Sequence, residues 1–391
     1  MSQFLAELGN NLDGRERFAP SWIQAQGKLG TVLIDTTSYS THSKNLSDAE
    51  WGKNRDGDLL PQINVQYAAS ESAMPLAYRR IPGSVPDVAT LKTSLDHFKE
   101  WGITSSIAVF DRGFFSKANL ERLISAKQEF VMAVPIGGTQ QRHLMKEHRR
   151  ALASPKNSFQ LGDDVVTGVA IQWAIDFALP AEGANLVNGI LVRNATVKAE
   201  RTASLMKTVF ELEVKAQDEA FKTPEAAEAW LEGSAPAYKK LLKPELSGAT
   251  WVLKRKPNVL AAWAETFGQQ IILSSKSMPI KSIAEVYRTR GDIEQIFDTP
   301  KNDLHQKRNR SGNDDVVDGH LFLSFLAVIL RRLLGDKLAQ SSDTKTLPLT
   351  RVQNLVRRIQ VHVSPHGKTF AYDITKPQRL ILQVVGIEIG I

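Results

Sequence analysis

Residues 280–301 read IKSIAEVYRTRGDIEQIFDTPK, and the interpretation of the whole chain starts from this stretch. Its apolar residues recur at helical spacing and predict one amphipathic helix: Ile283, Val286, Ile293 and Phe297. Four polar residues fall on one narrow stripe of that helix: Tyr287, Arg290, Glu294 and Lys301. A hydroxyl, a guanidinium, a carboxylate and an ammonium in one row suit a phosphate backbone with a metal ion beside it. The alternative is a solvated helix face stabilised by ion pairs.

Composition limits the classes of protein and of site. The chain has 391 residues, enough for a large core and two or three structural units, and it has no cysteine. Disulfides, thiolate metal sites and a cysteine nucleophile are therefore excluded. The net charge of +7 favours a polyanionic partner such as nucleic acid.

The sequence predicts no membrane segment. The N-terminus lacks the basic start and the long apolar run of a signal peptide. The most apolar stretch, 321–330, is followed at once by Arg331 and Arg332, and it is much shorter than the roughly 20 residues of a membrane-spanning helix. We expect a buried core helix there, and a soluble cytoplasmic protein without a membrane partner.

Two apolar runs end in an aspartate. Residues 30–35 read GTVLID and residues 106–111 read SIAVFD, which predicts strands with Asp35 and Asp111 at their C-terminal ends. Ligand sites in α/β sheets collect at such strand ends, although an aspartate that only caps the next turn explains each run equally well. Together with Glu294 they supply three hard oxygen donors, which suit Mg²⁺. Two such ions can clamp the attacking and leaving oxygens of a displacement at phosphorus.

The remaining elements of the N-terminal half predict a mixed sheet flanked by helices. They are expected in this order: strands 62–69 and 76–81, helix 86–101, strand 106–111, a helix capped by Ser116, and strand 129–134. We expect a loop over 39–60, and a linker over 243–248, where a proline and a glycine flank polar residues.

Five segments are predicted along the chain. They are a short N-terminal segment without clear periodicity (1–27), the first part of the core (28–135), an insertion (136–250), the second part of the core with the helix of 280–301 (251–345), and a tail with helices and a hairpin (346–391). Strands 251–255 and 269–274 are expected to return to the core. Tryptophans in or beside the insertion pack in a core or stack on a flipped base: Trp173, Trp251 and Trp263.

The motifs resemble those of a known family. Asp35-Thr-Thr, Asp111-Arg-Gly and the pattern Tyr287-x2-Arg290-x3-Glu294-x6-Lys301 are similar to bacterial insertion-sequence transposases of the DDE class. Within that class they resemble the subgroup named for its Tyr-Arg-Glu-Lys motif. The resemblance covers residues 28–335.

The resemblance implies a fold, a site and partners. The fold would be α/β, a ribonuclease-H-like mixed sheet flanked by helices, with a largely β insertion between the second and third acids. Asp35, Asp111 and Glu294 would be catalytic ligands of two Mg²⁺ or Mn²⁺ ions. Phosphates of the transposon end would be bound by a basic and aromatic set: Tyr287, Arg290, Lys301 and Arg112. Arg112 could equally orient Asp111 or be an ordinary turn residue. The partners would be double-stranded DNA and a second copy of the chain, in the bacterial cytoplasm.

The implied activity is DNA cleavage at transposon ends and strand transfer into target DNA. Two features leave alternatives open. Only 27 residues precede the predicted core, so the chain could be an N-terminally truncated, non-catalytic protein that dimerises with a full-length transposase and inhibits it. A ribonuclease-H-like nuclease without strand transfer is a third possibility. Pro300 is also expected to end or kink the helix just before Lys301 and to move that lysine off the stripe.

Overall fold

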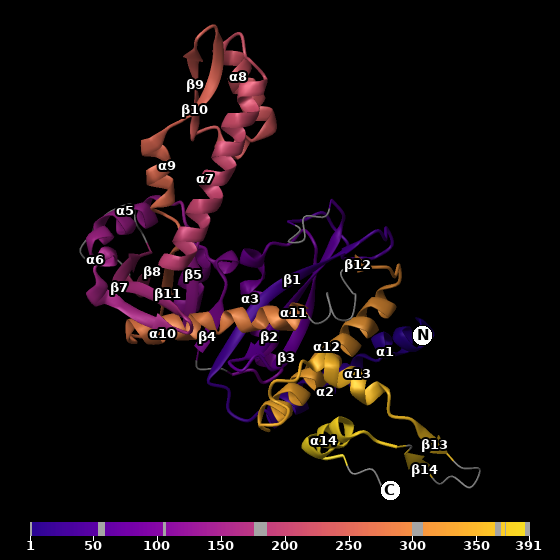
Figure 1. Ribbon diagram of the computed structural model, residues 1–391. Coiled ribbons are helices and arrows are strands. Elements are labelled where there is room, and N and C mark those ends of the chain that lie inside the picture. Colours follow the sequence, from indigo (N-terminus) through magenta and orange to yellow (C-terminus); the bar gives the residue numbers. More distant parts are fainter. Residues whose placement is uncertain are drawn as a thin grey trace. The chain divides into compact units, whose positions relative to one another are not determined.

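The computed structural model describes residues 2–53, 59–104, 107–175, 186–298, 308–363, 369–371 and 373–387. The chain divides into two compact units (Figure 1). Unit 1 comprises Met1–Pro86, Thr93–Ser105 and Gly291–Ile391, and unit 2 comprises Asp87–Lys92 and Ser106–Arg290. In the described part of the chain, none of the helices has the length and apolar character needed to cross a membrane.

The sheet of unit 1 is built on a hairpin that the sequence predicted. The strands β1 (Thr31–Thr41), β2 (Gln62–Ser70) and β3 (Pro75–Pro82) are antiparallel neighbours. The short strand β12 (Arg308–Asn309) pairs with β1 in parallel, which makes the sheet mixed. The turn between β2 and β3 contains Ala73 at a φ of 56°.

Asp35 is not at the end of its strand, and this prediction is wrong. β1 continues six residues beyond Asp35, in register with β2 as far as the pair Ser40 and Gln62. Thr36, Thr37 and Tyr39 are β-branched or aromatic residues that favour a strand, and all residues of β1 are buried. The expected loop therefore begins only after Thr41.

Two helices occupy the N-terminal segment for which no periodicity was apparent. They are α1 (Ser2–Asn10) and α2 (Leu12–Ala25). The Asn11 side chain accepts a hydrogen bond from the amide of Gly14 (2.9 Å), which caps α2. Phe18 of α2 packs edge-on against Phe322, 5.7 Å between ring centroids. Phe322 belongs to the long buried helix α12 (Asp314–Ala339), which confirms the predicted core helix.

The C-terminal elements of unit 1 follow the predicted order. They are α13 (Leu349–Arg357), the hairpin of β13 (Val361–Val363) and β14 (Thr369–Ala371), and α14 (Lys376–Val385). Leu338 of α12, Val352 of α13 and Ile381 of α14 form a small core of their own.

Unit 2 contains a six-stranded mixed sheet. Its strands are β4 (Ile107–Phe110), β5 (Phe130–Val134), β6 (Ser158–Leu161), β7 (Asp164–Ala174), β8 (Leu186–Asn194) and β11 (Gln269–Ser274), in the order β4-β5-β11-β8-β7-β6. β4 and β5 are parallel, and the other neighbours are antiparallel. Strands from the predicted insertion thus lie in the same sheet as β4 and β5.

Helices connect these strands. α3 (Asp87–Glu100) begins in unit 2 and continues in unit 1, and the 3-10 turn η1 (Arg112–Phe114) follows β4. α4 (Lys117–Ser125) is capped as predicted, since the Ser116 hydroxyl accepts from the Asn119 amide (3.1 Å). The later ones are α5 (Thr139–Glu147), α6 (Arg149–Ala153) and the 3-10 turn η2 (Pro155–Asn157).

Residues 195–268 pack around a separate core, with helices as well as strands where we expected a largely β insertion. The elements are α7 (Ala195–Asp218), α8 (Pro224–Ser234), the 3-10 turn η3 (Pro236–Tyr238), β9 (Leu242–Ser247), β10 (Thr250–Arg255) and α9 (Pro257–Ala264). The predicted linker at 243–248 is wrong, because β9 forms there. β10 pairs with β9 in a two-stranded sheet instead of returning to the large one. A two-stranded sheet has only edge strands, which tolerate Pro244.

The predicted helix of 280–301 is two helices in its described part. α10 (Ile280–Arg288) and α11 (Arg290–Asp298) are separated by Thr289. The Thr289 hydroxyl donates to the carbonyl of Val286 (2.7 Å), a side-chain bond to the preceding turn that bends helices. Residues 299–307 lie outside the described residues, and so do the predictions about Pro300 and Lys301.

Candidate active site

Asp111 lies in a turn directly after β4. The strand ends at Phe110, and Asp111 keeps an extended backbone before η1 begins. Its side chain makes no capping bond to that turn. Phe110 and Phe114 on either side are fully buried, with ring centroids 5.6 Å apart, and they anchor the turn in the core. The strand-end position predicted for Asp111 is therefore confirmed.

Two donors contact one carboxylate oxygen of Asp111. Arg290 Nη1 lies 3.3 Å from Oδ1, and the Tyr287 hydroxyl donates to the same oxygen over 3.4 Å. The side chains of Arg290 and Asp111 are 18% and 19% exposed, so water screens this ion pair less than a surface pair. The Arg290 guanidinium carbon also lies 6.0 Å from the centre of the Tyr287 ring.

Helix α10 holds Tyr287 against the sheet of unit 2. Ile283, Ala284 and Tyr287 are its buried residues, and their spacing of three to four puts them on one face. That face packs on β5 and β11. Burial of the ring at Tyr287 therefore fixes where its hydroxyl ends, next to Asp111.

Asp35 lies in the interior of unit 1. It has no exposed surface, and its Oδ1 accepts a hydrogen bond from the amide of Thr36 (2.8 Å). Its neighbour in register on β2 is Tyr67. Burial, more than the nearby Tyr39 and Tyr78, raises the pKa of the Tyr67 phenol, which therefore stays protonated beside Asp35.

The other predicted site residues lie on exposed or undescribed parts of the chain. Glu294 is exposed on α11, whereas its neighbours Ile293 and Ile296 are buried and hold the helix on unit 1. Arg112 is exposed at the start of η1. Lys301 lies outside the described residues. The structure thus brings Asp111, Tyr287 and Arg290 together within unit 2.

Residues 26–330 match the sequence model of the transposase DDE domain. The chain belongs to this family. The matched range includes every residue predicted for the site, from Asp35 to Lys301. Membership of the Tyr-Arg-Glu-Lys subgroup stays a prediction.

Other comparisons of this DDE domain reach less far. A search of curated proteins finds no match. Among solved structures, the chain is similar to a cryo-EM structure of a piggyBac transposase synaptic complex with hairpin DNA, with 9% identical residues and a TM-score of 0.39. The similarity covers 91% of this chain and 52% of the other, so the chain spans about half the length of that transposase.

The acids of the DDE domain are the right kind of ligand for a divalent cation, but they are not gathered into a ready site. Carboxylate oxygens are preferred by Mg²⁺. Among the described residues, however, no group of three or more His, Cys, Asp or Glu side chains is arranged to hold a metal ion. Asp111 instead has a cation and a hydroxyl on its Oδ1.

The sequence analysis missed a residue that supports the Asp111 turn. Asn119 of α4 is 2% exposed, and its amide nitrogen donates to the carbonyls of Phe114 (2.8 Å) and Val88 (2.7 Å). It therefore ties the end of η1 to the first turn of α3. A signal for this role was present, since Asn119 is a lone amide beside the apolar Leu120 and Leu123.

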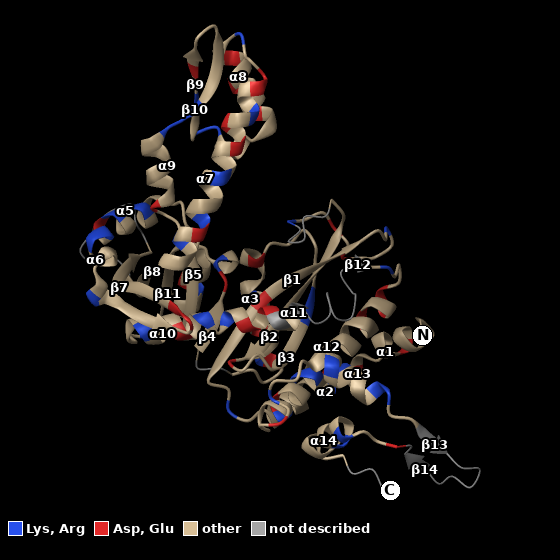
Figure 2. Ribbon diagram, viewed as in Figure 1, with Lys and Arg blue, Asp and Glu red and all other residues tan. Residues whose placement is uncertain are grey.

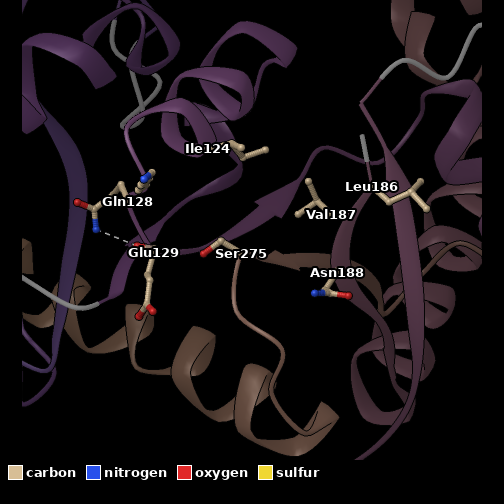
Figure 3. A pocket seen from close by; sticks show the side chains of 8 residues that line it. Ile124, Gln128, Glu129, Leu186, Val187, Asn188 and Ser275 are labelled. Carbon is tan, nitrogen blue, oxygen red and sulfur yellow. Dashed lines mark hydrogen bonds between the residues drawn. The ribbon is translucent and has the colours of Figure 1, made fainter. Parts of the chain in front are cut away.

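A cavity of about 310 Å³ lies elsewhere in unit 2. Figure 3 shows its lining: Ile124, Lys127, Gln128, Glu129, Leu186, Val187, Asn188 and Ser275. It opens at the first residues of β5, whereas Asp111 follows the last residue of the parallel strand β4. The cavity and Asp111 are therefore at opposite edges of the sheet.

Proposed function

We propose that this chain is a transposase that cleaves DNA at transposon ends and transfers the freed strand into target DNA, by cut-and-paste transposition. The observation that carries the proposal is membership of the transposase DDE domain family over residues 26–330, a range that includes all three acids. The contacts of Asp111 support it, because they join one acid of the motif to two residues of the Tyr-Arg-Glu-Lys pattern.

In this proposal Asp35, Asp111 and Glu294 are the catalytic acids, and the reaction depends on two Mg²⁺ or Mn²⁺ ions. We derive no step through these ions, because the described acids are not gathered around a common point. Bringing three carboxylates together requires counter-charge, which the ions and the positive side chains nearby both supply.

The proposed partners are double-stranded DNA and a second copy of the chain, in the bacterial cytoplasm. Arg290 and Lys301 suit phosphate because a guanidinium binds it through two parallel bonds and an ammonium acts as a point charge. Tyr287 and Arg112 complete the proposed phosphate contacts. Basic residues also gather on α5 and α6, where Figure 2 shows mostly blue: Arg142, Lys146, Arg149 and Arg150.

The test compares the wild type with Asp35→Asn, Asp111→Asn and Glu294→Gln on a duplex that carries the terminal repeat found beside the gene. Each change keeps the size of the side chain and removes its charge. We expect cleavage and strand transfer with Mg²⁺ or Mn²⁺ to fall at least about a hundredfold. Asp292→Asn is the matched control, since Asp292 is exposed on the same helix as Glu294 and is no part of the proposed site.

Equal activity in all these variants would overturn the proposal. Cleaved ends that never become joined to target DNA would restrict the activity to that of a nuclease. Circular dichroism of each variant separates a loss of chemistry from a loss of folding.

A further inference from the structure

The Asp111 carboxylate is held by positive and polar donors at the oxygen that a metal ion would need. Arg290 Nη1 and the Tyr287 hydroxyl both contact Oδ1, at 3.3 Å and 3.4 Å. Arg290 is only 18% exposed, and Tyr287 is buried against the sheet. The pair is therefore part of the packed structure of unit 2 and not a loose surface contact.

A divalent cation and this arginine compete for the same carboxylate. Mg²⁺ coordinates carboxylate oxygens at about 2.0–2.1 Å, so an ion on Oδ1 would lie within a few ångströms of the Arg290 guanidinium. Two positive charges that close repel each other, and partial burial strengthens the repulsion. This competition accounts for acids of the preferred chemistry that form no metal group among the described residues.

We propose that Arg290, supported by Tyr287, is a positioning residue that holds Asp111 and lowers its affinity for divalent cations until a phosphate draws the guanidinium away. The inference rests on the proposed function and adds an order of events to it. Arginine forms strong paired hydrogen bonds with phosphate oxygens, so a DNA phosphate can replace the carboxylate as its partner. DNA binding then frees Asp111 for the metal ion, and metal binding in the absence of DNA is disfavoured.

The experiment measures Mn²⁺ binding to the full chain by electron paramagnetic resonance and calorimetry, without DNA. Arg290→Gln removes the charge and is expected to raise the affinity for Mn²⁺ roughly tenfold, the scale on which one neighbouring charge shifts the affinity of a carboxylate for a cation. Arg290→Lys restores the charge and should return the affinity toward the wild-type value. Tyr287→Phe should give a smaller rise, because it removes only the hydroxyl.

Two controls make the comparison specific. Arg288→Gln removes the same charge from an exposed position on the same helix, and it should leave Mn²⁺ affinity unchanged. Asp111→Asn combined with Arg290→Gln should abolish the gain, since the gain depends on that carboxylate. A structural defect would not be reversed by lysine, so the recovery in Arg290→Lys distinguishes positioning from folding.

A second measurement adds duplex DNA of mixed sequence, after subtraction of Mn²⁺ bound by DNA alone. The ratio of Mn²⁺ affinities between Arg290→Gln and wild type should shrink toward one. An unchanged ratio overturns the exchange, and an equal or lower affinity in Arg290→Gln without DNA overturns the whole inference. The proposed function fails on a different result, namely normal cleavage and strand transfer by Asp111→Asn.

Discussion

Gly9 of α1 and Gly319 of α12 meet backbone to backbone where these two helices cross in unit 1. A Cβ atom at Gly319 would lie 1.9 Å from the carbonyl oxygen of Leu5 and 2.9 Å from the amide nitrogen of Gly9. A Cβ atom at Gly9 would lie 1.8 Å from the carbonyl oxygen of Asp315. Glycine inside a helix costs about 1 kcal/mol relative to alanine. The close crossing is therefore the physical reason for both glycines.

We expect Gly319→Ala to lower the free energy of unfolding by about 1–3 kcal/mol, because the added methyl group forces two helix backbones apart. Urea denaturation measures this loss. Gly335→Ala is the matched control on the same helix, since its Cβ would meet only Leu349 Cδ1 at 3.6 Å. The control should gain up to about 1 kcal/mol from helix propensity. Loss of stability in both variants would contradict the crossing.

Phe325 of α12 joins the long helix to the sheet of unit 1. It is 2% exposed, and its ring lies 5.2 Å from Tyr78 of β3 and 6.3 Å from Phe18 of α2, measured between centroids. Phe325→Ala should cost about 3–5 kcal/mol, because it leaves a cavity among three elements. Leu330→Ala removes an apolar side chain that is 66% exposed on the same helix, and its effect should stay within about 0.5 kcal/mol. Equal shifts in the unfolding temperature of the two variants would refute this account.

Periodicity predicted most elements of the chain but not all of their ends. The alternation and the apolar runs of β2, β3, β4 and β5 are local signals, and so is the face of α12. β1 was cut short at Asp35, because a hydroxyl-rich run such as 36–41 carries no apolar signal although its backbone pairs fully with β2. The amphipathic pattern of α1 and α2 is weak. Burial against α12 and the sheet compensates for that weakness, and the sequence alone does not reveal it.

The candidate site was predicted residue by residue, but its contacts were not. Asp111 could be found because a strand and a turn fix it locally. That Arg290 and Tyr287 turn to Asp111 depends on how α10 packs on β5, which brings together residues 176 and 179 positions apart in the sequence. Helical spacing puts two side chains on one face, but it does not say what that face meets.

Arg80 of β3 contacts three acids in unit 1: Asp48 and Asp318, each at 3.1 Å, and Asp314 at a shorter distance. Burial alone would raise the pKa of Asp314, but hydrogen bonds from Arg80 and Ser47 outweigh it and lower that pKa below the ordinary 3.8. A carboxyl whose pKa is lower in the folded chain stabilises the fold above pH 3.8. This stability is lost as the pH falls from 3.8 through the folded value.

We therefore expect Arg80→Met to lower the free energy of unfolding more at neutral pH than near pH 3, since at acid pH the wild type has already lost part of the interaction. Urea denaturation at the two pH values measures the difference. Arg79→Met is the control. Arg79 contacts only the Ser94 hydroxyl among its printed side-chain partners, at 3.5 Å, and burial lowers its pKa. A loss for Arg80→Met that does not change with pH would contradict the role of Asp314.

Asn119 determines how firmly the turn after Asp111 is held. Its amide group donates to the buried carbonyls of Phe114 and Val88, so Asn119→Ala leaves two acceptors without this partner in a dry interior. The expected loss is about 1–3 kcal/mol, with faster hydrogen–deuterium exchange over residues 111–116. Asn188→Ala is the control, because Asn188 contacts only an exposed glutamine side chain through its own, and the effect there should stay within about 0.5 kcal/mol. If exchange in the turn is unchanged in Asn119→Ala, η1 is held by Phe110 and Phe114 alone.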